Sequence, residues 1–183
     1  MALYVNNGTW KEANEVYVND DGTWKACVDV YINDGGTWKS VLYSSGSQEY
    51  TTPGTYSFTV PPAVYSIDVI AAAGGASGGT GWSCDTSCSG GGGGGGGGGS
   101  VADGSITVTP GQVLSITVGS GGAARTSSSQ TGASGTKTEI TGTSVNLSLN
   151  GGTGGNPGYN NSSGGTGGAG GTVASTTGFS GTS

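Results

Sequence analysis

The sequence contains no histidine, and only 9% of its 183 residues are charged. The absence of histidine excludes the Ser-His and Cys-His pairs that activate nucleophiles in many enzymes, and it removes the commonest metal ligand. The five basic residues form no cluster, which argues against a nucleic-acid-binding surface. We therefore expect a protein that is not an enzyme, that uses no cofactor or metal, and that has no nucleic-acid partner.

Helical and membrane-spanning patterns are also missing. No window carries the apolar spacing of an amphipathic α-helix, and no apolar run is long enough to span a membrane. The opening residues MALY lack the basic start and apolar core of a secretory signal. Apolar residues instead cluster in short alternating segments, while the net charge is only −6. This pattern differs from that of disordered chains and predicts an ordered all-β protein that is made in a cytoplasm, without membrane insertion.

Glycine is what the sequence has in excess, with 42 residues and an unbroken run of ten at Gly90–Gly99. Such a run is either a flexible linker or an ordered rod. The rod would be a polyglycine II helix, with three residues per turn and about 3.1 Å of rise per residue, stabilised sideways by other backbones. Two later segments, from Gly151 and from Gly164, repeat Gly-Gly-X, which places every X on one face of such a helix. Because the glycine segments lie between strands that we expect to pair, we favour packed rods over a linker.

Three copies of one short sequence repeat occupy the first part of the chain, at Tyr4–Lys11, Tyr17–Lys25 and Tyr31–Lys39. Each copy has an Asn/Asp/Gly turn between two short strand patterns, which is typical of a β-hairpin. We expect residues 1–43 to form a small β-meander with the tryptophans on one face. A segment of this size buries little core on its own, so it is expected to assemble with another chain or with a larger particle. The candidate assembly residues are Tyr4, Tyr17, Tyr31, Trp10, Trp24 and Trp38. Two alternatives remain open at this stage, namely that these aromatics fill the meander's own core or that they stack on sugars.

Residues 44–183 are expected to form a second, glycine-rich domain. Six strand patterns occur in it, at 55–60, 65–71, 105–109, 113–118, 136–141 and 144–149. Their number and spacing predict a β-sandwich or jelly-roll into which the polyglycine II segments are inserted. The sequence Pro61-Pro62-Ala63 is expected to be the turn that joins the first two strands.

Short segments without glycine runs separate the predicted rods and would form loops at their tips. Loops on a rigid scaffold often carry recognition, so Trp82, Asp85, Arg125, Tyr159 and Asn160 are the candidate binding residues. The alternative is that these side chains plug the ends of the bundle. Cys84 and Cys88 either form a small disulfide loop or remain free thiols.

Residues 49–122 contain a strand segment, a glycine run and a second strand segment, and they read from EYTTPGTYSFTVPPAVYSIDVIAAAGG to GSITVTPGQVLSITVGSGG. This order resembles the glycine-rich domain of bacteriophage tail fibre and tail-associated proteins. The phrase YVNDDGTWK is similar to repeats in such virion proteins. The resemblance implies a structural virion protein, assembled in the host cytoplasm and expected to be a homotrimer. Its partners would be other virion proteins and a receptor or glycan on the host surface.

Three other readings stay open. One is a head fibre or decoration protein attached to the capsid, and another is an ice-binding protein whose polyglycine II bundle offers a flat face. The third is a flexible glycine-rich linker or cell-wall protein.

Overall fold

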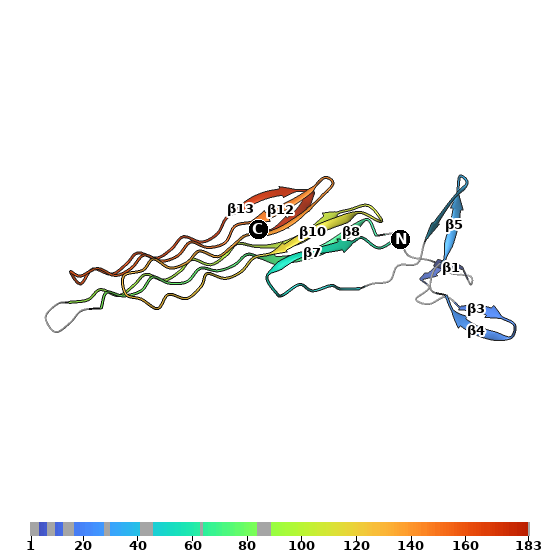
Figure 1. The fold of residues 1–183 in the computed structure, drawn as a ribbon. Coiled ribbons are helices and arrows are strands. Elements are labelled where there is room, and N and C mark those ends of the chain that lie inside the picture. Colours follow the sequence, from blue (N-terminus) through green and yellow to red (C-terminus); the bar gives the residue numbers. More distant parts are fainter. Residues whose placement is uncertain are drawn as a thin grey trace.

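The computed structural model describes residues 4–6, 10–12, 17–27, 30–40, 46–62, 64–83 and 89–182. Every regular element in these ranges is a β-strand, which confirms the predicted all-β class. No helix in the described part of the chain could cross a membrane. Figure 1 shows two sheets from which long, irregular-looking segments extend side by side in one direction.

The N-terminal repeats form three separate two-stranded sheets rather than one continuous meander. The pairs are β1 (Tyr4–Asn6) with β2 (Trp10–Glu12), β3 (Tyr17–Asp20) with β4 (Thr23–Ala26), and β5 (Tyr31–Asp34) with β6 (Thr37–Ser40). All three pairs are antiparallel and share one register, in which the tryptophan lies opposite an asparagine.

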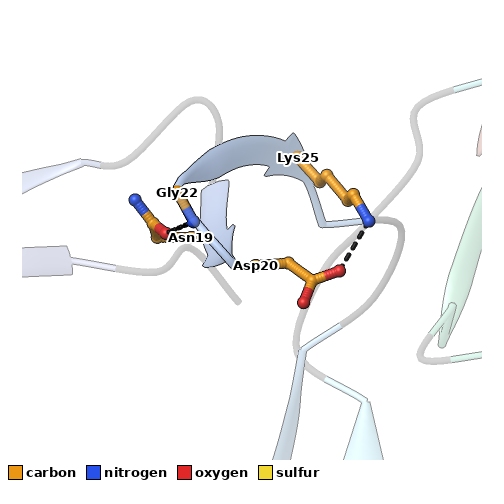
Figure 2. A network of polar contacts seen from close by, with 4 residues as sticks. All are labelled: Asn19, Asp20, Gly22 and Lys25. Carbon is orange, nitrogen blue, oxygen red and sulfur yellow. Dashed lines mark hydrogen bonds and ion pairs between the residues drawn. The ribbon is translucent and has the colours of Figure 1, made fainter.

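The turn of the second hairpin explains why its sequence reads Asn-Asp-Asp-Gly. Asp21 and Gly22 both have positive φ, at 54° and 84°, as the favoured two-residue hairpin turn requires. The Gly22 amide donates a hydrogen bond to Asn19 Oδ1 at 2.9 Å, and Lys25 forms an ion pair with Asp20 across the strands at 2.5 Å (Figure 2). The ion pair is exposed on both sides, so it contributes at most about 1 kcal/mol.

Eight further strands form two antiparallel sheets. The five-stranded sheet has the order β13-β12-β11-β10-β7, and the three-stranded sheet has the order β14-β9-β8. Their bounds are β7 Gly54–Thr59, β8 Ser66–Ala72, β9 Val101–Thr107, β10 Val113–Val118, β11 Thr138–Gly142, β12 Val145–Leu149, β13 Val173–Thr177 and β14 Phe179–Thr182.

Both sheets contribute to a single apolar core. Ile106 of the smaller sheet and Leu114, Leu147 and Leu149 of the larger one are at most 1% exposed. The remaining buried members are Val60, Ala102, Val108, Ile140 and Val145. The alternating burial of β8 and β11 follows from the period-2 pattern of their sequences, as expected for strands with one buried face.

The segment at Pro61 and Pro62 joins the first two core strands, as predicted, but these strands do not pair with each other. β7 pairs with β10, and β8 pairs with β9, so the segment containing Pro61 and Pro62 carries the chain from one sheet to the other. Val60 shows why: its amide donates to Gln112 O and its carbonyl accepts from the Gly111 amide, so β7 ends beside the turn before β10. Ala63 lies outside the described residues.

The glycine-rich segments are continuations of three β-hairpins. One leaves β8 and returns to β9, the next joins β10 to β11, and the last joins β12 to β13, so each lies between paired strands as the sequence predicts. We number their arms as six rods: rod 1 (73–82), rod 2 (90–100), rod 3 (119–125), rod 4 (130–137), rod 5 (150–159) and rod 6 (163–172). Rod 2 contains the ten consecutive glycines.

Main-chain hydrogen bonds between the rods repeat every third residue. The amides of Ala73, Ala76, Gly79 and Trp82 in rod 1 donate to rod 2 at 2.8–3.0 Å, and rod 2 donates to rod 5 with the same repeat. This repeat is the one that a threefold extended helix requires, because every third residue then faces the same neighbour. Gly90–Gly99 is thus paired laterally and does not behave as a free linker in this structure.

The hydrogen bonds connect the rods in the pattern of two stacked layers. Rod 1 bonds to rods 2, 3, 4 and 5, and rod 5 bonds to rods 1, 2, 4 and 6; rod 2 bonds to rod 6, and rod 3 to rod 4. An arrangement of two layers gives all of these contacts: the first layer has the rods in the order 3-1-2, and it lies on a second layer that has the rods in the order 4-5-6. We call them the first layer and the second layer.

Close backbone approach explains the glycines between the layers. A Cβ at Gly94 would lie 2.0 Å from Thr166 O, and one at Gly97 would lie 1.9 Å from Ala169 O. Real Cβ atoms do not approach backbone so closely. At the base of the bundle, the buried Thr138 hydroxyl donates to Ala72 O at 2.8 Å and accepts from the Gly119 amide at 2.9 Å, which joins β11 to β8 and to the first residue of rod 3.

Candidate binding tip of the glycine rods

The rods extend away from the sheets, and their far ends lie at one end of the bundle (Figure 1). The Ser129 amide in the loop of rods 3 and 4 donates to Gly81 O near the end of rod 1, at 3.2 Å. The Ser162 amide in the loop of rods 5 and 6 donates to Ser89 O before rod 2, at 3.1 Å. These bonds connect two loops to the ends of rods 1 and 2, so the structure brings together candidates that lie up to 78 positions apart, from Trp82 to Asn160. We call this region the tip.

Trp82 and Tyr159 are placed by the same residue of the decaglycine rod. The Trp82 amide donates to Gly91 O, and the Gly91 amide donates to Tyr159 O, both at 3.0 Å. The two aromatic residues thus lie on rods that flank Gly91. Their exposed fractions are 38% for Trp82 and 50% for Tyr159. They do not plug the bundle as fully buried residues would, and their faces are available for contact.

Polar groups accompany the two aromatics. Asn160 and Arg125 are both exposed. The Arg125 Nε donates to Thr131 O at 3.1 Å, which orients the guanidinium along rod 4. Positive φ at Ser129 and Ser162, 58° and 65°, lets both loops turn within a few residues. An exposed tryptophan, an exposed tyrosine and amide and guanidinium donors together suit a polar ligand with an apolar face, such as a sugar.

The remaining predicted tip residues, Asp85, Cys84 and Cys88, lie outside the described residues. Cys27 in the hairpin region is a half-buried free thiol.

The predicted assembly residues are exposed wherever their side chains are described. The exposed fractions are 67% for Trp24, 68% for Trp38, 49% for Tyr17 and 55% for Tyr31. In the second hairpin the tryptophan and tyrosine share a face, because Trp24 lies two positions along from Ala26, the partner of Tyr17, and the third hairpin has the same register. The aromatics therefore do not fill a core within the described hairpins. The side chains of Tyr4 and Trp10 lie outside what the structure describes.

A shallow depression of about 720 Å³ lies on the outer face of the smaller sheet. Its lining includes the carboxylates of Glu49, Asp68 and Asp103. No group of three or more His, Cys, Asp or Glu side chains in the described ranges is arranged to hold a metal ion. The depression is open and acidic, and it lies at the sheets, whereas the tip candidates lie at the other end of the rods.

Sequence reasoning missed the hydroxyl side chains that align the rods. Ser77 Oγ accepts from the Ala133 amide at 2.8 Å, and Thr80 Oγ1 accepts from the Gln130 amide at 2.8 Å. Both lie on rod 1, three residues apart, and both face rod 4. The signal was present in the sequence, since Gly74, Ser77 and Thr80 occupy one register of a three-residue repeat within the glycine block.

The comparisons with known proteins cover the part of the chain that carries the sheets and rods. The model of one family, described as a glycine-rich domain, matches residues 51–183. Searches of curated proteins and of solved structures found no significant match.

Proposed function

The chain belongs to the glycine-rich domain family, and on that premise we propose that it is a non-enzymatic structural protein of a bacteriophage virion. In this proposal it is a component of a tail fibre, it is attached through its aromatic hairpins, and it contacts the host surface through the tip. The observation that carries the proposal is the position of exposed Trp82 and Tyr159 on either side of Gly91, at the end of a laterally bonded rod bundle.

The rods support this role through their stiffness. We interpret them as polyglycine II helices; at about 3.1 Å per residue, the ten residues of rod 1 span roughly 31 Å. Single rods of this kind have no internal hydrogen bonds, but each rod here is bonded to at least two others. Such a bundle holds its loops at a fixed distance from the sheets, which is what a receptor-binding tip needs.

The hairpins support the attachment role. A two-stranded hairpin with no further partner is marginally stable in water, and these hairpins expose large aromatic side chains. Tyrosine and tryptophan are enriched in the buried centres of protein interfaces. We propose that these faces pack on other copies of the chain, as a homotrimer, or on neighbouring virion proteins.

The test is made on phage particles that carry variants of this protein. Trp82→Ala with Tyr159→Ala is expected to reduce adsorption to host cells at least tenfold while the protein is still found in purified particles. Trp24→Ala with Trp38→Ala is expected to reduce incorporation into particles. Failure to find the wild-type protein in any purified particle refutes the virion role, and unchanged adsorption of the tip variant refutes the tip.

A capsid location differs from a tail location only in where the hairpins attach. Immunogold labelling of intact particles with an antibody to the full chain distinguishes the two. Label on the head would replace the tail-fibre assignment by a head fibre or decoration protein, and the tip would retain its proposed contact role.

An ice-binding role is favoured by a single observation, the polar outer face of the second layer. Thr153, Asn156 and Thr166 lie on it at the three-residue repeat, about 9.3 Å apart along a rod. These side chains, however, bond to one another, with Asn156 Nδ2 donating to Thr166 Oγ1 at 2.7 Å. A measurement of thermal hysteresis on the full chain decides this candidate, and a value of zero removes it.

A further inference from the structure

Rods 1 and 2 carry almost no side chains on the outer face of the first layer. Rods 1 and 2 expose there a set of glycines that we call the bare face: Gly75, Gly78 and Gly81 of rod 1, with Gly92, Gly93, Gly95, Gly96 and Gly98 of rod 2. All eight are exposed. The second layer is different, because its outer face carries the Thr and Asn side chains of rods 5 and 6.

Internal packing does not account for several of these glycines. A Cβ at Gly92, Gly95 or Gly98 would meet nothing within 4 Å, and one at Gly75 would meet its first atom at 3.9 Å. The equivalent outward positions of rods 5 and 6 hold asparagine, threonine, alanine and tyrosine. The same rod geometry therefore tolerates side chains on one outer face, while the other outer face has none.

The bare face also retains unused main-chain hydrogen-bonding groups. Within the described residues, the amides of Gly75, Gly78 and Gly81 have no partner, and the same holds for the amide and the carbonyl of both Gly93 and Gly96. On the second layer the protein's own side chains cover such groups. Thr153 Oγ1 accepts from the Ala169 amide at 2.6 Å, and Ser134 Oγ accepts from the Gly154 amide at 3.4 Å.

We infer that the bare face is an interaction surface for the bare face of a second copy of this chain, with which it extends the rod lattice by backbone-to-backbone hydrogen bonds. The face is self-complementary, because it offers donors and acceptors at one three-residue repeat. A partner must match that repeat and must approach without side chains, and rods 1 and 2 of another copy meet both conditions. A twofold arrangement of identical faces is also the commonest symmetry of protein dimers.

The size of the face indicates a weak association. The two rods of the bare face, at the roughly 4.8 Å spacing of hydrogen-bonded backbones and each about 31 Å long, cover about 300 Å² per copy, or about 600 Å² in total. Stable specific interfaces bury about 1,200–2,000 Å², and smaller ones belong to transient complexes. We therefore expect the bare face by itself to leave copies separate at low micromolar concentration and to pair them toward millimolar concentration, or when copies are held close together.

The test is sedimentation equilibrium of the full chain from about 10 µM to 1 mM. Wild type is expected to form dimers within this range. Gly75→Asn with Gly95→Asn places side chains at two open positions of the bare face and is expected to weaken dimerisation at least tenfold. The matched control is Ala169→Asn, which adds the same side chain to the outer face of the second layer and is expected to leave dimerisation unchanged.

Two further measurements separate this surface from the hairpins and from misfolding. The double variant Trp24→Ala with Trp38→Ala is expected to retain the concentration-dependent association. If the association is lost in that variant, it belongs to the hairpins and the inference is overturned. Amide exchange of the wild-type decaglycine is expected to slow as concentration rises, a readout that needs no variant. A wild-type chain that remains monomeric at 1 mM, with exchange independent of concentration, also overturns it.

Discussion

Alanine substitutions along the decaglycine rod are predicted to alternate in effect with a period of three. Gly94→Ala and Gly95→Ala change neighbouring residues of an identical sequence, yet their environments are opposite. The Gly94 Cβ would lie 2.0 Å from Thr166 O, whereas the Gly95 Cβ would meet nothing within 4 Å. The first substitution is expected to destabilise the fold strongly, and the second is expected to leave it intact.

The magnitude follows from how far the rods must move. To reach an ordinary contact distance, rods 2 and 6 must separate by about 1.4 Å at Gly94. The neighbouring bond from the Gly165 amide to Gly92 O, now 2.8 Å, would then exceed the range of a hydrogen bond. Overpacking costs about 1–3 kcal/mol, and each lost hydrogen bond costs about 0.5–1.5 kcal/mol. Gly94→Ala should therefore lower the free energy of unfolding by roughly 2–5 kcal/mol.

Gly95→Ala is expected to raise stability by about 0.4–1 kcal/mol, because alanine restricts the unfolded chain and fits this backbone without strain. For a chain of this size, 1 kcal/mol corresponds to about 2–4 °C in Tm. Thermal unfolding by circular dichroism, at a few micromolar protein to keep the chain monomeric, should show a Tm lowered by about 4–20 °C for Gly94→Ala and a slightly raised Tm for Gly95→Ala. Equal effects of the two substitutions would refute the packed rod.

The remaining predictions concern the junction, the rod amides and acid stability. Thr138→Val removes the hydroxyl that bonds Ala72 O and the Gly119 amide, and it should cost about 1–3 kcal/mol in urea unfolding, whereas Thr138→Ser should retain most of the stability. Hydrogen exchange in Gly90–Gly99 should be slow at every third amide, those that donate to rod 5, and uniform fast exchange would contradict the lattice. The hydrogen bond from Lys137 holds the pKa of Glu139 below its usual range, with a smaller effect from Ser148. Its stabilisation is present above the unfolded pKa of about 4.3 and lost as pH falls through the folded value, so Glu139→Gln should lower Tm at pH 7 but not at pH 2.

The sequence predicted the class and the placement of the glycine segments because both depend on local patterns. Period-2 alternation identified six core strands. The glycine segments were predicted to lie between strands that pair, and each rod hairpin does begin and end at paired strands. The run of Asn, Asp and Gly residues in each repeat likewise indicated the hairpin turns, including the positive φ at Gly22.

The pairing of β7 with β10 could not be predicted by the same rules. Strands that are adjacent in sequence usually pair, but Pro61 and Pro62 carry the chain across to the other sheet, and only tertiary packing around Val60 decides this. β13 and β14 were missed because their serine, threonine and glycine content gives weak apolar alternation. Gly178, with φ of 71° between them, was the available signal.

The tip was predicted as a set of separate loops, but not as one cluster. Residues Trp82 and Tyr159 come together because Gly91 bonds to both, and that depends on the registers of three rods. No single-sequence pattern contains this information. The binding role of these residues and the boundary between residues 1–43 and 44–183 stay predictions.

Because every rod hairpin begins and ends at a strand of the two sheets, the length of the bundle is independent of the fold that anchors it. Adding one Gly-Gly-X triplet to all six arms would move the loops outward by about 9.3 Å and leave every contact register intact. Adding one or two residues would instead turn each later residue toward the wrong neighbour. The distance between the loops and the sheets can therefore change only in steps of a full helical turn. The loop sequences at the far end can vary without affecting the sheets.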